Sequence, residues 1–462
     1  MQKQAQQLLD WVDARFPLTF LWESQWGKYV APKNFNFWYI FGSLAMLVLV
    51  IQIVTGIFLV MHYKPDASLN AAGVPVAFAS VEYIMRDVPG GWIIRYLHST
   101  GASAFFVVVY LHMFRGLMYG SYRKPRELVW LFGVAIFLCL MAEAFFGYLL
   151  PWGQMSFWGA QVIVNLFGAI PLIGEPLSIM IRGDYVVSDA TLNRFFSFHV
   201  IAIPLVLIGL VAAHLTALHE VGSNNPDGVE IKKQPKDANG IPLDGIYSHP
   251  YYTIKDIFGA VVFLFVFAAV VFFMPEGGGY FLEFNNFIPA DPLKTPPHIA
   301  PVWYFTPYYS ILRATTSDFM LWLGIFVLVV GGLSVFSLRH QLAKLAAAGV
   351  TAVLLVAFYF LDAKFWGVVL MGVSVLLFAL LPWLDRSPVK SIRYKGGLYK
   401  GILAVFVVCF VVLGYLGILP PTPVGTIVSQ ICSILYLGFF AFMPWYTAMD
   451  KTQPEPERVT WQ

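Results

Sequence analysis

The chain has 462 residues, of which 58% are hydrophobic and only 12% are charged, and its mean hydropathy is +0.70. A soluble protein needs a more polar surface than this composition supplies, so the sequence predicts an integral membrane protein. The formal net charge of +3 is too small to indicate a nucleic-acid partner. The three cysteines have no CxxC or CxxCH spacing, which argues against a disulfide framework, an iron–sulfur cluster, a zinc site and covalent haem.

The chain begins with a charged segment, residues 1–35, that has no apolar core of the kind found in signal peptides. We expect this segment to form an amphipathic helix on the membrane surface. After it come ten apolar runs, each long enough to cross a bilayer. The ten runs are residues 38–60, 92–118, 129–149, 196–218, 257–274, 318–337, 345–361, 366–384, 401–419 and 425–445.

The connections between these runs alternate in character. Those on one side are basic, which predicts that they and both chain termini lie on the cytoplasmic side. The basic connections are residues 123–126, 232–236, 339–344 and 386–400. The long connections on the other side, residues 61–91, 150–195 and 275–316, have few basic residues and many Pro, Gly and aromatic residues. We expect them to form short helices that fold back onto the membrane face and build a site.

Two of the runs carry histidines at matching heights. His98 and His112 lie fourteen residues apart, which places them roughly 21 Å apart along one helix and only about 40° apart around it. The fourth run carries a second pair, His199 and His214. Two helices that each carry a high and a low histidine can hold two flat metal macrocycles by bis-imidazole ligation. The spacing therefore predicts two non-covalent haems, one near each membrane face.

Glycines on the first and third runs repeat the same interval. They are Gly42 and Gly56, and Gly133 and Gly147, each pair fourteen residues apart. A helix without a side chain at those heights lets a porphyrin edge approach its backbone, although ordinary helix packing also uses small residues. The register with the histidines favours the cofactor interpretation.

Arginines flank the histidines toward the membrane faces. Arg95 and Arg115 lie three residues from His98 and His112, and Arg194 precedes His199 by five residues. A haem propionate in a low-dielectric site needs a cation, so we expect these three arginines to bind propionates. The alternative is that they extend from the helix ends to the membrane surface.

Longer motifs around these residues resemble the cytochrome b family of the cytochrome bc complexes. They are RYLHSTGAS, YLHMFRG, GYLLPWGQMSFWGA, DATLNRFFSFH and LHEVGSNNPDG. The resemblance implies an all-α integral membrane fold, in which a dihaem four-helix bundle is joined by further spans, and the apolar runs bring the total to about ten. It implies a multi-pass protein of the bacterial inner membrane and the core subunit of a quinol:cytochrome c oxidoreductase. His98 and His199 would bind the periplasmic haem, and His112 and His214 the cytoplasmic one.

The resemblance also implies the two substrate sites and the partners. The quinol oxidation site would contain Tyr148, Gly159, Pro301, Trp303, Tyr304, Phe305 and Tyr309. The quinone reduction site would contain His219, Ser223, Lys255 and Asp256. Ubiquinol and ubiquinone are the implied substrates in a proton-motive Q cycle. The implied partners are a Rieske iron–sulfur protein, cytochrome c1, a second copy of the chain in a homodimer, and lipid.

This resemblance divides the chain into five regions. They are the surface helix of residues 1–35, the dihaem bundle of 36–220, the quinone-site loops with the fifth span and the quinol-site loop of 221–316, a transmembrane hairpin of 317–362, and a three-helix region of 363–462. The hairpin is a departure from the family pattern. Two added spans leave the orientation of everything downstream unchanged, so we expect both to form, at the periphery.

Two smaller departures concern the sites themselves. Val302 stands in a PVWY motif where the family often has the glutamate of PEWY, and valine cannot accept a proton. We expect another group to accept the quinol proton, with Tyr304, Tyr148 and His298 as candidates in that order. His199 and His214 are fifteen residues apart where many relatives have fourteen, which predicts a wide turn near residues 200–206 that restores the facing of both rings.

Two other functions remain open at this stage. One is a transporter that relays protons through its histidines, which predicts several acidic residues inside the spans, although Glu143 is the one obvious case. The other is a dihaem anchor of a membrane dehydrogenase, which would lack the quinol-oxidising loop of residues 290–313.

Overall fold

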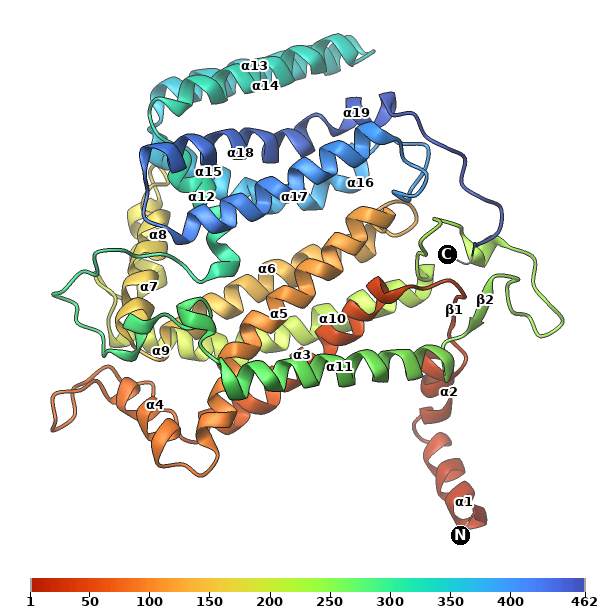
Figure 1. Ribbon diagram of the computed structural model, residues 1–462, viewed down its shortest axis with the longest axis horizontal. Helices are drawn as coiled ribbons and strands as arrows, with labels where there is room; N and C mark the ends of the chain where they lie inside the picture. Colours follow the sequence, from red (N-terminus) through yellow and green to blue (C-terminus); the bar gives the residue numbers. More distant parts are fainter. Residues whose placement is uncertain (1, 461–462) are drawn as a thin grey trace.

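The computed structural model describes residues 2–460, and this part of the chain is mostly helical (Figure 1). Ten of its helical segments are long and apolar enough to cross a membrane, as many as the sequence predicts. They are α3 (Ile40–Val60), α5 (Gly91–Tyr119), α6 (Glu127–Leu149), α9 to α10 (Asp189–Ser197 and Ile203–Val221), α11 (Tyr251–Phe273), α13 (Phe319–Ser337), α14 (Gln341–Phe360), α15 to α16 (Ala363–Leu376 and Leu381–Leu384), α17 (Gly397–Ile418) and α18 (Pro423–Ala441).

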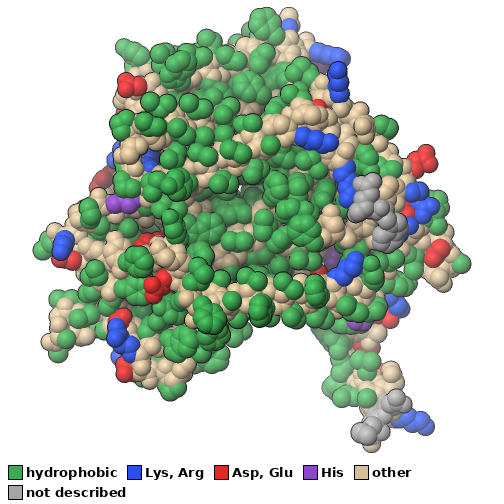
Figure 2. Space-filling view, in the orientation of Figure 1, with side chains coloured by type: hydrophobic (Ala, Val, Ile, Leu, Met, Phe, Trp, Pro, Cys, Tyr) green, Lys and Arg blue, Asp and Glu red, His purple; other side chains and the backbone are tan. Residues whose placement is uncertain are grey.

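Hydrophobic side chains cover most of the face seen in Figure 2, and charged side chains gather at the ends of the long helices. This distribution suits a protein whose flanks meet lipid and whose two ends meet water. The chain is therefore built as a multi-pass membrane protein.

Four of the long helices form a bundle. Helix α3 packs along α5, α6 packs along α10, and α11 covers the outer side of α3. Helix α5 begins after Gly90 and ends at Gly120, and both of these glycines have left-handed backbone conformations that favour glycine. These two breaks fix the length of α5 and therefore the heights at which its two histidines lie.

The fourth helix of the bundle contains a wide turn. Between α9 and α10, residues Phe198–Ala202 form the π-helix η3, and Pro204 follows at the start of α10. The predicted wide turn is confirmed, and it begins two residues earlier than expected. The extra residue between His199 and His214 is absorbed here, so the two rings can face the same partner helix.

A second layer of helices packs beside the bundle. Helix α12 (Thr306–Ala314) lies against α15, α17 and α18, around a core that includes Phe406, Tyr436 and Phe440. Helices α13 and α14 pair with each other at the outer edge of this layer (Figure 1), and α13 contacts α18. Large side chains of the pair, such as Phe336 and Tyr359, are mostly exposed. The hairpin helices thus lie at the periphery, where their apolar surface suits lipid.

The remaining elements are short, and the sequence predicts those within the long connections of residues 61–91, 150–195 and 275–316. They are α1 (Gln2–Asp13), α2 (Leu18–Trp22), η1 (Glu23–Gly27), β1 (Val30–Pro32), η2 (Phe37–Tyr39), α4 (Val76–Arg86), α7 (Gln154–Phe167), α8 (Gly174–Arg182), η4 (Ile231–Lys233), β2 (Gly245–Tyr247), η5 (Gly277–Gly279), η6 (Phe284–Phe287), η7 (Trp303–Phe305), η8 (Leu377–Leu380) and α19 (Met443–Met449). Strands β1 and β2 pair antiparallel, with Val30 opposite Tyr247. This small sheet fixes the segment before α3 to the loop between α10 and α11.

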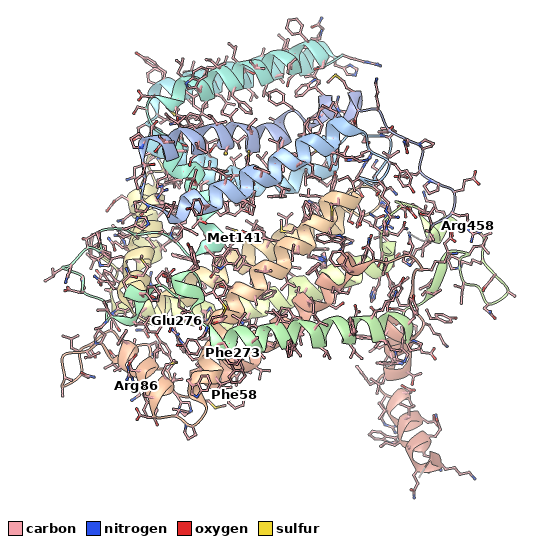
Figure 3. The ribbon with its side chains drawn as sticks, in the orientation of Figure 1. Phe58, Arg86, Met141, Phe273, Glu276 and Arg458 are labelled. Carbon is pink, nitrogen blue, oxygen red and sulfur yellow. The ribbon has the colours of Figure 1, made fainter. Side chains whose placement is uncertain are left out.

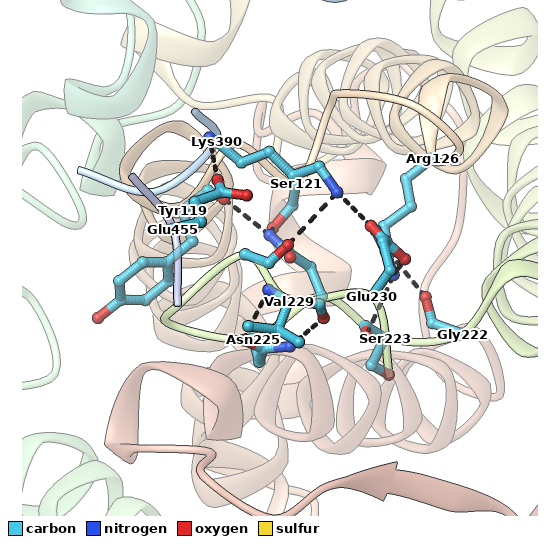
Figure 4. Close-up of polar contacts among 12 residues, drawn as sticks. Tyr119, Ser121, Arg126, Gly222, Ser223, Asn225, Val229, Glu230, Lys390 and Glu455 are labelled. Atoms are coloured by element: carbon cyan, nitrogen blue, oxygen red, sulfur yellow. Dashed lines mark hydrogen bonds and ion pairs between the residues drawn. The ribbon is translucent and has the colours of Figure 1, made fainter. Parts of the chain in front are cut away.

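A polar cluster ties the bundle to the second layer at one end of the molecule (Figure 4). The Arg126 guanidinium lies 2.6 Å from the Glu230 carboxylate, which also pairs with Lys390 from the loop before α17. The backbone N–H of Lys390 donates to Glu455 in the C-terminal tail. Burial alone would raise the pKa of Glu230, but hydrogen bonds from Arg126 and Lys390 lower it below the ordinary value.

Candidate functional site

The four predicted haem ligands form two facing pairs inside the bundle. The ring centroids of His98 and His199 are 6.0 Å apart, and those of His112 and His214 are 6.4 Å apart. An imidazole nitrogen binds a first-row metal at about 2 Å, so two imidazoles on opposite sides of one metal have centroids roughly 6 Å apart. The spacing of both pairs therefore fits axial ligation of one metal each.

The outer nitrogens of three of these rings, those of His98, His199 and His214, are held by neighbouring helices. His98 Nδ1 lies 2.9 Å from the Thr55 hydroxyl, and His214 Nδ1 lies 2.9 Å from the carbonyl oxygen of Val129. His199 Nδ1 lies 3.0 Å from both the carbonyl oxygen and the carboxylate of Glu143. These contacts fix the ring orientations and leave Nε2 of each ring available as the ligand atom.

The four predicted glycines lie against the histidine rings. A side chain at Gly147 would come within 2.4 Å of the His199 ring, and one at Gly42, Gly56 or Gly133 would come within 3.2, 3.3 or 3.4 Å of a ring atom. The expectation was a porphyrin edge at these heights, and the structure places an imidazole edge there. The glycines therefore make room for the ligands themselves.

Two of the three predicted arginines have a buried nitrogen that a propionate could accept from. Arg95 Nη1 and Arg115 Nε are buried nitrogen atoms without a hydrogen-bond partner in residues 2–460. Such a donor needs an acceptor, which a propionate would supply. The structure does not bring Arg194 to a histidine pair, because its exposed side chain lies against Gly183 and donates to the carbonyl of Met180.

The donor set at each pair suits a macrocycle. In the described part of the chain no group of three His, Cys, Asp or Glu residues is placed to hold a metal ion. Each pair supplies two axial ligands, so the remaining ligands must come from the bound group itself. The buried arginines, the facing imidazoles and the glycines together fit two haems.

The residues that the resemblance assigns to quinol oxidation contact the bundle between its middle and its His98 end. The Tyr304 ring stacks on Phe106 at 3.9 Å, and Trp303 donates to Ser103 on α5. Tyr148 lies against Gly159. A Cβ atom added at Gly159 would lie 3.5 Å from the Tyr148 ring. Pro301 and Phe305 flank this aromatic group, whereas Tyr309 lies under the Arg313 guanidinium on α12.

Tyr148 also contacts a residue that the sequence analysis did not identify. Its hydroxyl donates to the Glu283 carboxylate at 2.7 Å. Burial raises the pKa of Glu283 to about 7, although the bond from Tyr148 opposes this. Close by, a cavity of about 240 Å³ is lined by residues that include Arg95, Asn286, Phe287 and Glu82. The space that can admit water is thus lined by residues three and four positions along the chain from Glu283.

The residues assigned to quinone reduction lie at the other end and fall into two groups. His219 stacks on Tyr29 with centroids 4.3 Å apart, and the Tyr29 hydroxyl lies 3.0 Å from that of Ser223. His219 Nδ1 is 2.6 Å from Gln25 Oε1. Asp256 lies next to Ser43 on α3, and the Lys255 ammonium lies over the Tyr251 ring. Gln25 and Tyr29 come from the N-terminal segment, and the sequence analysis assigned no role to either.

Two family models match the chain. One, described as cytochrome b/b6/petB, matches residues 26–222, and the other, described as the C-terminal part of cytochrome b with b6/petD, matches residues 289–437. The chain belongs to the cytochrome b family. Cytochromes of this family bind two b-type haems and act on quinone, and they form the core subunit of the quinol:cytochrome c oxidoreductase of the respiratory chain.

Similar proteins cover nearly the whole chain. Cytochrome b of Allochromatium vinosum is 55% identical, with 98% of each chain covered, and that of Cereibacter sphaeroides is 43% identical, with 97% of this chain and 92% of the relative covered. Among solved structures, a chain of a hyperthermophilic respiratory Complex III has a TM-score of 0.76 and 35% identity, and covers 96% of this chain and 99% of its own. The whole architecture is therefore that of a respiratory cytochrome b.

Proposed function

We propose that this cytochrome b oxidises ubiquinol beside the His98–His199 pair and reduces ubiquinone beside the His112–His214 pair. When bound, the two haems supply one-electron carriers between these sites. The second electron of each quinol goes to a Rieske iron–sulfur protein. The observation that carries the proposal is the placement of two facing imidazole pairs, about 20 Å apart along α5, each beside a different cluster of aromatic and ionisable side chains.

The orientation in the membrane follows from charge. The His112 end carries Arg126, Lys390 and Arg393. The other end carries Glu276 and the paired Arg86 and Glu82. Figure 3 shows Arg458 at one end and Arg86 and Glu276 at the other, and Figure 1 shows both chain ends on the side of Arg458. By the positive-inside rule, this end faces the cytoplasm of a bacterial inner membrane, and the quinol site faces the periplasm.

At the quinol site, Glu283 accepts the proton that Val302 cannot. Of the three candidates expected from the sequence, Tyr304 packs its ring on Phe106, and His298 is bonded through Nε2 to the carbonyl of Ile418 at 2.7 Å. Tyr148 remains, and its hydroxyl leads directly to Glu283. An ionised Glu283 receives a proton through Tyr148 or from the quinol, and the cavity lined by Asn286 and Phe287, which follow Glu283 in the chain, offers the proton a way to the periplasm.

At the quinone site, His219 and Asp256 supply protons from the cytoplasmic side. His219 is held by the N-terminal segment, because Tyr29 stacks on its ring and Gln25 accepts from Nδ1. This arrangement leaves Nε2 to face the substrate. The quinone carbonyls then receive protons at the membrane face opposite to the one where Glu283 releases them.

The partners follow from what the chain does not carry. The sequence contains no motif for an iron–sulfur cluster or covalent haem, so the acceptors of the second electron are separate: a Rieske protein and then cytochrome c1. A relative from Bradyrhizobium diazoefficiens, 40% identical, is named cytochrome b/c1, and this chain matches 56% of its length. A homodimer of the complex and lipid against the exposed helix faces complete the assembly.

The other two functions are less well supported. A proton transporter does not account for imidazole pairs at metal-binding spacing, and a dihaem anchor does not need the loop of residues 290–313. That loop forms η7 and the start of α12 and places Tyr304 against the bundle.

The test is a spectrum followed by single substitutions. A dithionite-reduced minus oxidised spectrum of the purified protein should show two b-type haems, and His98→Asn and His112→Asn should each remove one. In membranes, His219→Asn should slow reoxidation of the haems by ubiquinone and leave quinol oxidation in the first turnover unchanged. One haem in the unsubstituted protein, or no effect of His219→Asn, contradicts the proposal.

A further inference from the structure

Two carboxylates in the loop between α10 and α11 are fully buried, although this loop lies outside the spans. They are Asp227 and Asp244, and each is 0% exposed. A buried charge is stable only where hydrogen-bond donors surround it. Burial by itself raises the pKa of both groups, but the hydrogen bonds that they accept hold each pKa below its ordinary value. Both groups are therefore ionised at neutral pH.

Asp244 joins the N-terminal segment to the C-terminal tail, residues 450–460. Its carboxylate accepts from the Lys33 ammonium at 2.8 Å, and the Arg458 guanidinium binds both of its oxygens at 2.8 Å (Figure 3 labels Arg458). The backbone N–H of Val459 donates to the same carboxylate at 3.0 Å. Two parallel bonds between a guanidinium and a carboxylate are strong and specific in geometry, so Arg458 is the main link from the tail.

Asp227 makes a second link of the same kind. It accepts from the side-chain amide of Asn34 at 2.9 Å and from the backbone N–H of Thr460 at 2.7 Å. Its other oxygen accepts from Arg393 in the loop before α17. Because Lys33 and Asn34 are adjacent, the tail is joined to the N-terminal segment at two neighbouring points.

The same N-terminal segment forms one wall of the proposed quinone site. Tyr29 stacks on the His219 ring, and Gln25 meets its Nδ1. The backbone after Tyr29 continues into β1, which pairs with β2 in a two-stranded sheet of three residues per strand. A sheet of two short strands is marginally stable by itself. The position of Tyr29 therefore depends also on the two carboxylate links that follow β1 in the chain.

We infer that the C-terminal tail is a positioning element of the quinone site. The inference rests on the proposed role of His219 in that site. Arg458, acting through Asp244, holds the N-terminal segment in place. This segment in turn keeps the His219 ring in one orientation through Tyr29 and Gln25. Arg458 acts through other residues, so it is a positioning residue and not a catalytic one.

The test measures reoxidation of the haems by ubiquinone in membranes. A displacement of about 1 Å can lower a rate by up to 10²-fold, and we expect Arg458→Ala to slow reoxidation about tenfold. The two haem spectra and quinol oxidation in the first turnover should stay unchanged. In the purified complex, backbone amides of residues 29–34 should exchange with deuterium faster, because exchange reports local opening of a segment.

A matched control separates this effect from a general change in the tail. Glu457 precedes Arg458 and has an exposed side chain, so Glu457→Ala should alter neither reoxidation nor exchange. In a His219→Asn background, Arg458→Ala should cause no further slowing, because both changes act on the same step. Additive losses, or equal slowing by Glu457→Ala, overturn the inference.

The remaining outcomes are also decisive. If the Arg458→Ala protein does not assemble with two haems, Arg458→Lys takes its place, because an ammonium keeps the charge but lacks the planar fork that binds both oxygens of Asp244. An unchanged reoxidation rate in whichever variant is assayed overturns the inference, even if exchange becomes faster. If His219→Asn leaves reoxidation unchanged, the proposed function of the site fails. If His219→Asn slows reoxidation and the Arg458 variant does not, only the present inference fails.

Discussion

Replacing Glu283 with Gln tests whether this carboxylate receives the quinol proton. Burial raises the pKa of Glu283 from 4.5 to about 7, so a rising share of the group is ionised as the pH increases through neutrality. A base must be ionised to accept a proton, and the rate of quinol oxidation should therefore rise with pH through about 7. Glutamine cannot accept that proton, and general-base contributions are on the order of 10² or more, so we expect about a 100-fold loss of kcat.

The assay is quinol-dependent reduction of cytochrome c by the purified complex between about pH 5.5 and 8.5, a range in which carboxyl groups with ordinary pKa values stay ionised. In the Glu283→Gln enzyme, the rise of the oxidation rate with pH near pH 7 should disappear, while KM for quinol changes little. Glu276→Gln is the control, because Glu276 lies in the same loop and accepts a hydrogen bond from Tyr96 instead. The reasoning is refuted if the Glu283→Gln enzyme still shows the rise in rate near pH 7 and oxidises quinol within twofold of the rate of the unsubstituted enzyme.

Three further substitutions test other contacts. Gly147→Ala places a methyl group 2.4 Å from the His199 ring, so one b-type haem should be lost from the reduced-minus-oxidised spectrum, and a spectrum with two haems would contradict the contact. Gln25→Leu removes the acceptor from Nδ1 of His219 and should slow haem reoxidation by ubiquinone about tenfold. The same change in a His219→Asn background should have no further effect, and additive losses would argue against a shared role. Glu230→Gln breaks a partly buried carboxylate pairing and should cost about 2 kcal/mol in thermal unfolding at pH 7. Because the folded pKa of Glu230 lies below the ordinary 4.5, this stabilisation is present above that pH and is lost as the pH falls, so the two proteins should converge in acid.

The sequence predicted the features that depend on local pattern. Apolar runs gave the ten spans, because a bilayer imposes a minimum length on each helix. The fifteen-residue interval between His199 and His214 predicted the π-turn, since one extra residue rotates a regular helix by about 100°. The histidine pairs were predictable for the same reason: their spacing along two helices fixes height and face.

Other parts of the site depend on contacts between distant segments. Glu283 meets Tyr148 across 135 residues, and neither periodicity nor a local motif marks the contact. The same is true of Gln25 and His219, which are 194 residues apart. The contact of Glu143 with His199 could have been predicted, because Glu143 lies four residues before Gly147 and so shares its helix face. Arg194 was expected at a haem, but its side chain turns to the Met180 carbonyl because Gly183 leaves space there.

The polar cluster at the His112 end has a consequence for how the protein is assembled. Glu455 and Thr460 reach back to Lys390 and Asp227, which belong to loops in the two halves of the chain. These tail residues leave the ribosome after all ten spans, whereas the four-helix bundle is complete by residue 221. The contacts of the tail with the two halves therefore form last, after the whole four-helix bundle has been synthesised.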